Sequence, residues 1–154
     1  MAISASISQT GRKSILAFKN GYHGGVLSFQ AGNDTNAPYP VVLSDYNDLE
    51  GTLDLIEEHA QDLAAIILEP MMGSGGGIPA RADFLQALRD TADKHGIVLI
   101  FDEVMTSRLS SGGFQKQMGI LPDITTMGKY IGGGLSFGAF GGKQEIMARF
   151  DPSG

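Results

Sequence analysis

The chain has no cysteine and no tryptophan. Without cysteine there can be no disulfide framework and no thiolate-ligated metal ion. The absence fits the reducing environment of the cytoplasm, and we expect a cytoplasmic protein. The three histidines, His23, His59 and His95, show none of the spacings that are typical of metal ligands, so we expect no metal site.

Basic residues and long apolar runs are also scarce. Lysine and arginine number 11 against 17 aspartates and glutamates, which gives a net charge of −6 and an isoelectric point of about 4.9. No basic residues cluster, so we expect no nucleic-acid partner. No apolar run approaches the roughly 20 residues of a membrane-spanning helix, and the first residues lack the pattern of a secretory signal, so we expect no membrane partner either.

What the sequence does contain is an alternation of apolar runs and amphipathic stretches. Residues 63–69 and 97–102 are nearly continuous apolar runs, which are typical of parallel strands covered on both faces. Strands are also expected at 14–18 and 41–43, and weaker ones at 124–127 and 137–141. Helical patterns cover 47–60, 81–95 and 144–150. Asn47 or Asp48 can cap the first helix, and Gly96 can end the second. The alternation predicts an α/β fold with a mostly parallel sheet flanked by helices.

A lysine and a carboxylate stand at the ends of two expected strands. Asp102 ends the strongest apolar run, and Lys129 closely follows the run at 124–127. Ligands of open α/β sheets bind beyond the carboxyl ends of the strands, so both side chains are expected in one crevice. An amine that forms an imine with an aldehyde, and a carboxylate that keeps a pyridine nitrogen protonated, are what pyridoxal phosphate chemistry requires. Glu103 points away from Asp102 if the segment stays extended, so we expect a structural or peripheral role for it.

Further residues follow strand ends in the same way. Glu69 ends one apolar run, and Tyr22 and His23 follow another by a few residues. The aromatic faces of this pair suit stacking on a pyridine ring. Plainer interpretations exist for all of these positions. Lys129 could be a solvated surface lysine, Asp102 could cap the next turn, Glu69 could simply end its strand, and Tyr22-His23 could be an ordinary loop pair.

Glycine is abundant, at 22 of 154 residues, but its runs do not complete a nucleotide-binding pattern. A phosphate-binding P-loop ending at Gly128-Lys129 would need glycine in place of Asp123 and serine or threonine in place of Tyr130. The other glycine runs do not complete the dinucleotide fingerprint. A nucleotide-binding module is therefore disfavoured, and the glycines are expected to permit unusual backbone angles and close chain approach.

Several segments together resemble one family. They are Thr10-Gly-Arg-Lys, Gly21-Tyr-His-Gly-Gly, Ile66-Ile-Leu-Glu-Pro-Met-Met-Gly, Asp102-Glu-Val-Met-Thr, Asp123-Ile-Thr-Thr-Met-Gly-Lys-Tyr-Ile-Gly-Gly-Gly-Leu and Gly138-Ala-Phe-Gly-Gly-Lys. In order and at similar spacing they resemble the core of the class III pyridoxal-phosphate-dependent aminotransferases, in particular the glutamate-1-semialdehyde aminomutase-like branch. The resemblance runs through nearly the whole chain.

The resemblance implies a fold-type-I large domain and a role for each candidate residue. In the parent enzyme Lys129 would form the internal imine with pyridoxal 5'-phosphate, and Asp102 would stabilise the protonated pyridine. Tyr22 and Val104 would lie against the two faces of the ring. The two remaining candidates, His23 and Glu69, would be supporting polar residues beside the cofactor. Small-molecule amines or amino acids would be the substrates, a homodimer the assembly, and both transaminase and aminomutase activity stay open.

The resemblance also implies that residues 1–154 are a partial large domain. The family's glycine-serine/threonine loop for the cofactor phosphate and its smaller C-terminal domain have no counterpart here, so we expect a truncated form that is inactive by itself. Met105 stands where many relatives carry glutamine. The alternative is a non-catalytic α/β remnant or assembly subunit that keeps the motifs by descent.

Overall fold

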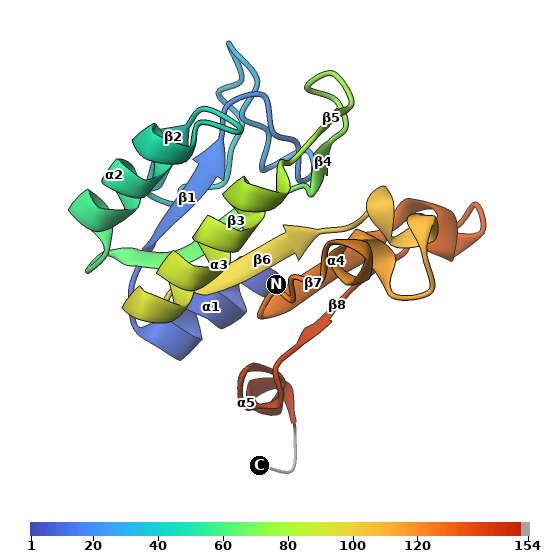
Figure 1. Cartoon of the computed structure of the whole chain (residues 1–154). Helices are drawn as coiled ribbons and strands as arrows, with labels where there is room; N and C mark the ends of the chain where they lie inside the picture. The colour runs from blue at the N-terminus through green and yellow to red at the C-terminus, as the bar shows by residue number, and fades with distance from the viewer. Residues whose placement is uncertain (152–154) are drawn as a thin grey trace.

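The computed structural model describes residues 1–151, which form a six-stranded sheet with helices on both faces (Figure 1). In spatial order the strands are β2 (Val41–Ser44), β1 (Ser14–Phe18), β3 (Leu63–Leu68), β6 (Val98–Asp102), β7 (Ile124–Gly128) and β8 (Gly138–Gly142). All neighbours pair in parallel except β8, which runs antiparallel to β7. The predicted α/β fold with a mostly parallel sheet is confirmed.

The helices follow the expected alternation with two additions, at the first residues and after β6. They are α1 (Ala2–Thr10), α2 (Leu49–His59), α3 (Ala82–His95), α4 (Gly113–Met118) and α5 (Gln144–Met147), with 3-10 turns η1 (Thr106–Leu109), η2 (Lys129–Gly132) and η3 (Ala148–Phe150). The helices predicted at 47–60 and 81–95 are α2 and α3, and the stretch 144–150 divides into α5 and η3. The helices α1 and α4 lie outside the three predicted helical stretches. No helix within residues 1–151 is long and apolar enough to cross a bilayer.

The predicted helix caps are present. The Asp48 carboxylate accepts a hydrogen bond from the Gly51 N–H at 3.2 Å, which satisfies one of the free amides in the first turn of α2. At the end of α3, Gly96 adopts a left-handed conformation with φ of 62°, which glycine reaches without a steric penalty. Residues 73–77, which are rich in glycine, connect the two strands of a hairpin, β4 (Met71–Met72) and β5 (Ile78–Pro79).

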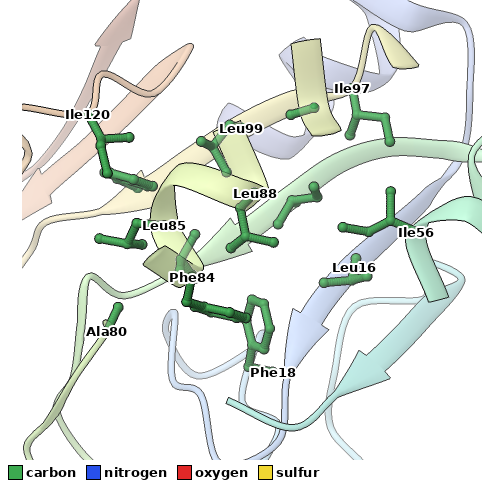
Figure 2. Packing of buried hydrophobic residues seen from close by; sticks show 14 of the residues in the cluster. Leu16, Phe18, Ile56, Ala80, Phe84, Leu85, Leu88, Ile97, Leu99 and Ile120 are labelled. Carbon is green, nitrogen blue, oxygen red and sulfur yellow. The ribbon is translucent and has the colours of Figure 1, made fainter. Parts of the chain in front are cut away.

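One face of the sheet packs against α2 and α3. Phe84, Leu85 and Leu88 of α3 lie against Leu16 and Phe18 of β1 in a fully buried cluster (Figure 2). The apolar residues of α3 recur at the spacing that places them on one side of the helix. Burial of side chains of this size contributes roughly 1.5–3 kcal/mol each.

The other face packs against α1 and α5. Ile15 and Ala17, which alternate with the residues that face α3, contact a second buried cluster that includes Ile3 of α1 and Ile146 of α5. A strand alternates its side chains between two faces, so β1 is apolar after Ser14 because both of its faces are covered. The sheet therefore lies between two helical layers, and the carboxyl ends of its parallel strands lie at the same edge.

Asp123 holds the start of β7 in place. Its side chain is 6% exposed, and its Oδ2 accepts hydrogen bonds from the Leu99 N–H at 2.7 Å and from Arg89 Nη1 at 3.0 Å. Its Oδ1 lies 2.6 Å from Lys143 Nζ. One carboxylate therefore joins β6, α3 and the residue that follows β8.

We expect Asp123→Ala to destabilise the fold by about 3 kcal/mol or more, because removing one partner of a buried ion pair leaves an uncompensated charge. Urea unfolding followed by circular dichroism measures the change. Asp54→Ala, at an exposed position of α2, is the matched control and should stay within about 0.5 kcal/mol of the parent chain. A loss no larger in Asp123→Ala than in this control would contradict the structural role.

Candidate active site

A cleft of about 570 Å³ opens at the carboxyl ends of the parallel strands. All six residues selected from the sequence line it: Tyr22, His23, Glu69, Asp102, Val104 and Lys129. They come from the segments that follow β1, β3, β6 and β7, which the parallel topology brings to one edge. The expectation that separate segments meet in one crevice is confirmed. The binding of a cofactor by these residues stays a prediction.

Asp102 and His23 form a buried pair at the floor of the cleft. Their side chains are 8% and 3% exposed, and Asp102 Oδ2 lies 2.8 Å from His23 Nδ1. A carboxylate only accepts, so Nδ1 is the nitrogen that carries a proton toward it. The other oxygen, Oδ1, accepts from the Val104 N–H at 3.1 Å. Two donors thus fix the orientation of the carboxylate.

Lys129 lies on strained backbone at the rim. Its φ of 51° is in the left-handed region that residues other than glycine seldom occupy. The next residue, Tyr130, donates its hydroxyl to Ser107 Oγ at 3.1 Å, and the Arg108 guanidinium lies 4.9 Å from the centre of its ring. These contacts join η2 to η1, so the loop after β6 supports the turn that carries Lys129. Strain of this kind concentrates at functional sites.

Glycines let the chain pass close to this turn. A Cβ on Gly132 would lie 2.9 Å from Phe137 Cβ, and one on Gly128 would lie 3.2 Å from the Phe137 carbonyl oxygen. The same Cβ on Gly128 would contact Val104 at 3.6 Å, so Val104 packs beside the residue that precedes Lys129. The glycine run therefore serves close chain approach, as expected from the sequence.

The two glutamates near the site have different surroundings. Glu103 is fully buried, and its carboxylate accepts from the N–H groups of Phe114 and Gln115 at 2.7 and 2.9 Å and from the Thr106 hydroxyl at 2.9 Å. It therefore caps α4 and holds η1, and the structural role expected for it is confirmed. Glu69 lies at the rim of the cleft. Its carboxylate accepts hydrogen bonds from the backbone N–H groups of Tyr22 and Gly73.

The remaining wall of the cleft is largely apolar. It includes Val26, Leu27, Tyr39, Met105 and Phe140. Sequence reasoning noted Met105 but did not select the others. Those from the irregular segment after β1 carry no periodic pattern, and Phe140 reaches the cleft because it pairs with Thr126 of β7, which also lines the cleft. Among residues 1–151, Lys129 is the one lysine or arginine that lines the cleft.

Comparison with known proteins gives consistent matches. A family model described as aminotransferase class-III matches residues 30–154. The β-phenylalanine transaminase of Variovorax paradoxus is 50% identical over 153 residues, which cover 99% of this chain and 35% of the relative. A solved structure of a β-phenylalanine aminotransferase from that organism superposes with a TM-score of 0.96 over 100% of this chain and 36% of its own.

Two further matches extend the range of activities. A glutamate-1-semialdehyde 2,1-aminomutase of Chlorobium phaeobacteroides strain BS1 is 48% identical over 161 residues, covering 94% of this chain and 37% of the relative. A transaminase solved with PLP bound is 33% identical, with a TM-score of 0.89 over 99% of this chain and 39% of its own. The chain spans little more than a third of the length of the curated relatives it matches.

The backbone of Lys129 gives a prediction about stability. We expect Lys129→Gly to be more stable than Lys129→Ala by about 1 kcal/mol, because glycine adopts a positive φ without the clash that alanine suffers. Thermal unfolding of both variants measures the difference.

The same pair of substitutions at Lys116, an exposed position within α4, is the control. There glycine should be the less stable variant by up to about 1 kcal/mol, because glycine is unfavourable in a helix. Equal stability of the two Lys129 variants would show that the turn relaxes and holds no strain.

Proposed function

Because the chain belongs to the class III aminotransferases, we propose that it forms the cofactor-binding part of an enzyme that transfers amino groups with pyridoxal 5'-phosphate. The observation that carries the proposal is the placement of Lys129 and a buried Asp102 in one cleft, each delivered by the end of a parallel strand. The relatives that match this chain include both a transaminase and an aminomutase. Both reactions require an amine and a carboxylate of this kind.

The residues of the cleft fit the cofactor. Asp102 is oriented by two donors and retains acceptor positions toward the cleft, as a partner of a protonated pyridine requires. Met1, Ala2 and Ile3 at the start of α1 also line the cleft.

When bound, pyridoxal 5'-phosphate supplies an aldehyde that condenses with amines and a ring that accepts electrons. The Lys129 Nζ would hold the cofactor covalently and, once released by a substrate amine, would move a proton at the reacting carbon. Asp102 would hold the proton on the ring nitrogen, and His23 would keep Asp102 oriented. Tyr22 and Val104 would hold the ring in its plane by contact with its faces.

The substrate that this site supports is a small-molecule amine or amino acid. The apolar wall formed by Val26, Tyr39 and Phe140 suits an apolar substituent of such a substrate. A relative that is half identical acts, by its name, on β-phenylalanine, which carries an aromatic group. These two observations support an amine with an apolar side chain as the first compound to assay.

We further propose that the complete enzyme is a homodimer. Near the site, Ile131, Leu135 and Phe137 are large apolar side chains that are 39%, 81% and 52% exposed. Exposed apolar groups close together in this way are typical of surfaces that a partner covers. Sedimentation of the complete protein tests this assembly, and a monomer at high concentration would exclude it.

Labelling identifies the reactive lysine. We expect borohydride reduction of the chain mixed with pyridoxal 5'-phosphate to fix the cofactor on Lys129, as shown by peptide mapping, since this lysine alone lines the cleft within residues 1–151. Lys116→Ala, which removes an exposed lysine, should leave the labelled peptide unchanged. Label on Lys143, or spread over surface lysines, would favour the alternative of a non-catalytic remnant.

Asp102→Asn tests the second group. The variant has the same shape but no charge, so the pKa of the ring nitrogen of the bound cofactor should fall by about one to three pH units, because an adjacent anion no longer favours the protonated form. Titration of nitrogen-15-labelled cofactor by NMR measures this pKa. Asp54→Asn, remote and exposed, is the control. An unchanged pKa in Asp102→Asn would remove this aspartate from the proposed mechanism.

A further inference from the structure

Glu69 lies where three loops of the cleft meet. It directly follows β3, is 8% exposed, and uses both oxygens of its carboxylate. Oε2 accepts from the Tyr22 N–H at 3.1 Å, and Oε1 accepts from the Gly73 N–H at 3.1 Å. We call these two hydrogen bonds the Glu69 bridge. It joins the loop after β1, which carries Tyr22, to the hairpin of β4 and β5.

The bridge is made by a carboxylate that no basic side chain neutralises. None of the ion pairs within residues 1–151 includes Glu69. A buried charge is costly unless hydrogen bonds replace its water, and here two backbone amides do so. Hydrogen bonds to an ionised acceptor are roughly twice as strong as neutral ones. The two amides and the carboxylate therefore stabilise one another's positions.

The base of the bridge is anchored in the core. The Tyr46 hydroxyl donates to the main-chain oxygen of Glu69 at 2.6 Å, and its ring packs edge-on against Phe18 with centres 5.6 Å apart. Burial, together with the Glu69 charge, raises the pKa of Tyr46 well above its ordinary value, so the hydroxyl remains a donor. The main chain of Glu69 is therefore bonded to a tyrosine that packs in the core.

Close packing of the joined loops supports the same role. A Cβ on Gly75 would lie 3.1 Å from the Asn20 carbonyl oxygen, and one on Gly73 would lie 2.3 Å from Met105 Sδ. The hairpin therefore approaches the loop before Tyr22 closely at Gly75 and the loop after β6 closely at Gly73. A shift of either joined loop would move the others.

We propose that Glu69 is a positioning residue that sets the place of Tyr22 in the cleft through the Glu69 bridge, and does not itself bind the cofactor. The proposal rests on the proposed function for the identity of the group that Tyr22 faces. A carboxylate can accept from both N–H groups because it has two acceptor oxygens. The side-chain amide of glutamine has the same shape but only one acceptor oxygen, so it can accept from one N–H group while its NH2 group faces the other.

Amide hydrogen exchange of the 154-residue chain, without cofactor, tests the bridge directly. In Glu69→Gln we expect exchange at the Tyr22 or Gly73 N–H to become about tenfold faster, the loss expected for a hydrogen bond to a charged acceptor. Amides in the middle of β3 and β6 should keep their protection. Glu50→Gln, which removes an exposed charge from α2, is the matched control. Unchanged exchange at both amides would overturn the proposal.

A second variant guards against general unfolding. Glu69→Asp keeps the charge but shortens the side chain, so it can reach at most one of the two amides. If Glu69→Gln unfolds, which faster exchange throughout β3 and β6 would reveal, the same local loss should appear in Glu69→Asp. Protection of both amides in a folded Glu69→Asp variant would contradict the bridge. Tyr22→Phe keeps the N–H and should leave both amides protected.

The positioning role has its own measurement. With pyridoxal 5'-phosphate added, Glu69→Gln should still be labelled at Lys129 but should show a several-fold weaker affinity and an altered circular dichroism band of the bound chromophore, which depends on its aromatic neighbour. Faster amide exchange with an unchanged band and affinity would overturn the role in the cleft. Failure of the parent chain to bind the cofactor would instead contradict the proposed function, and the exchange result would still decide whether the bridge exists.

Discussion

Parallel strands can be neighbours only if a crossover returns the chain to the same end of the sheet after each strand. Because both faces of such a sheet are apolar, the crossovers must also supply the helices that cover them. In this protein α2 and α3 cover one face, and α1 with α5 covers the other. Every parallel strand therefore ends at the same edge, and the cleft lies where polar side chains can follow buried strands without entering the core.

Buried carboxylates at the strand ends show how this edge is organised. Glu103 is satisfied by amides of α4, Glu69 by amides of the rim, and Asp102 by His23 and one amide. Asp123, at the opposite end of β7, is paired with Arg89 and Lys143. Each anion has the donors that its burial demands. Asp102 is the one of these four carboxylates that lines the cleft and is paired with a histidine, His23. Its charge is therefore available to stabilise a positive charge on a group bound in the cleft.

Sequence reasoning succeeded where a local pattern has a local cause. The apolar runs at 63–69 and 97–102 became β3 and β6, and Asp48 and Gly96 cap helices as their chemistry requires. It failed for α4, whose six residues have no amphipathic repeat and begin beside glycines. That helix depends on the carboxylate of Glu103, ten residues upstream of its start, and no local pattern encodes such a contact.

The candidate site divides in the same way. Residues at strand ends could be selected from the sequence because parallel topology dictates where they go. The apolar wall could not, since Phe140 reaches the cleft through a pairing with Thr126 that the sequence does not specify, and Tyr39 belongs to an irregular segment. The hydrogen-bond partners of Glu69 could not be predicted either, because they are main-chain N–H groups, which every residue but proline carries.

The two groups proposed for chemistry differ in how they are held, and the difference suits their tasks. Asp102 ends a strand and is fixed by two donors, so its charge stays at one point, as stabilisation of a developing charge requires. Lys129 begins a short turn, exposed at the rim and supported from one side through Tyr130. An amine that first holds a cofactor and then moves a proton must reach more than one position. The flexible four-carbon stem of a lysine supplies that reach, while the backbone of the turn stays in place.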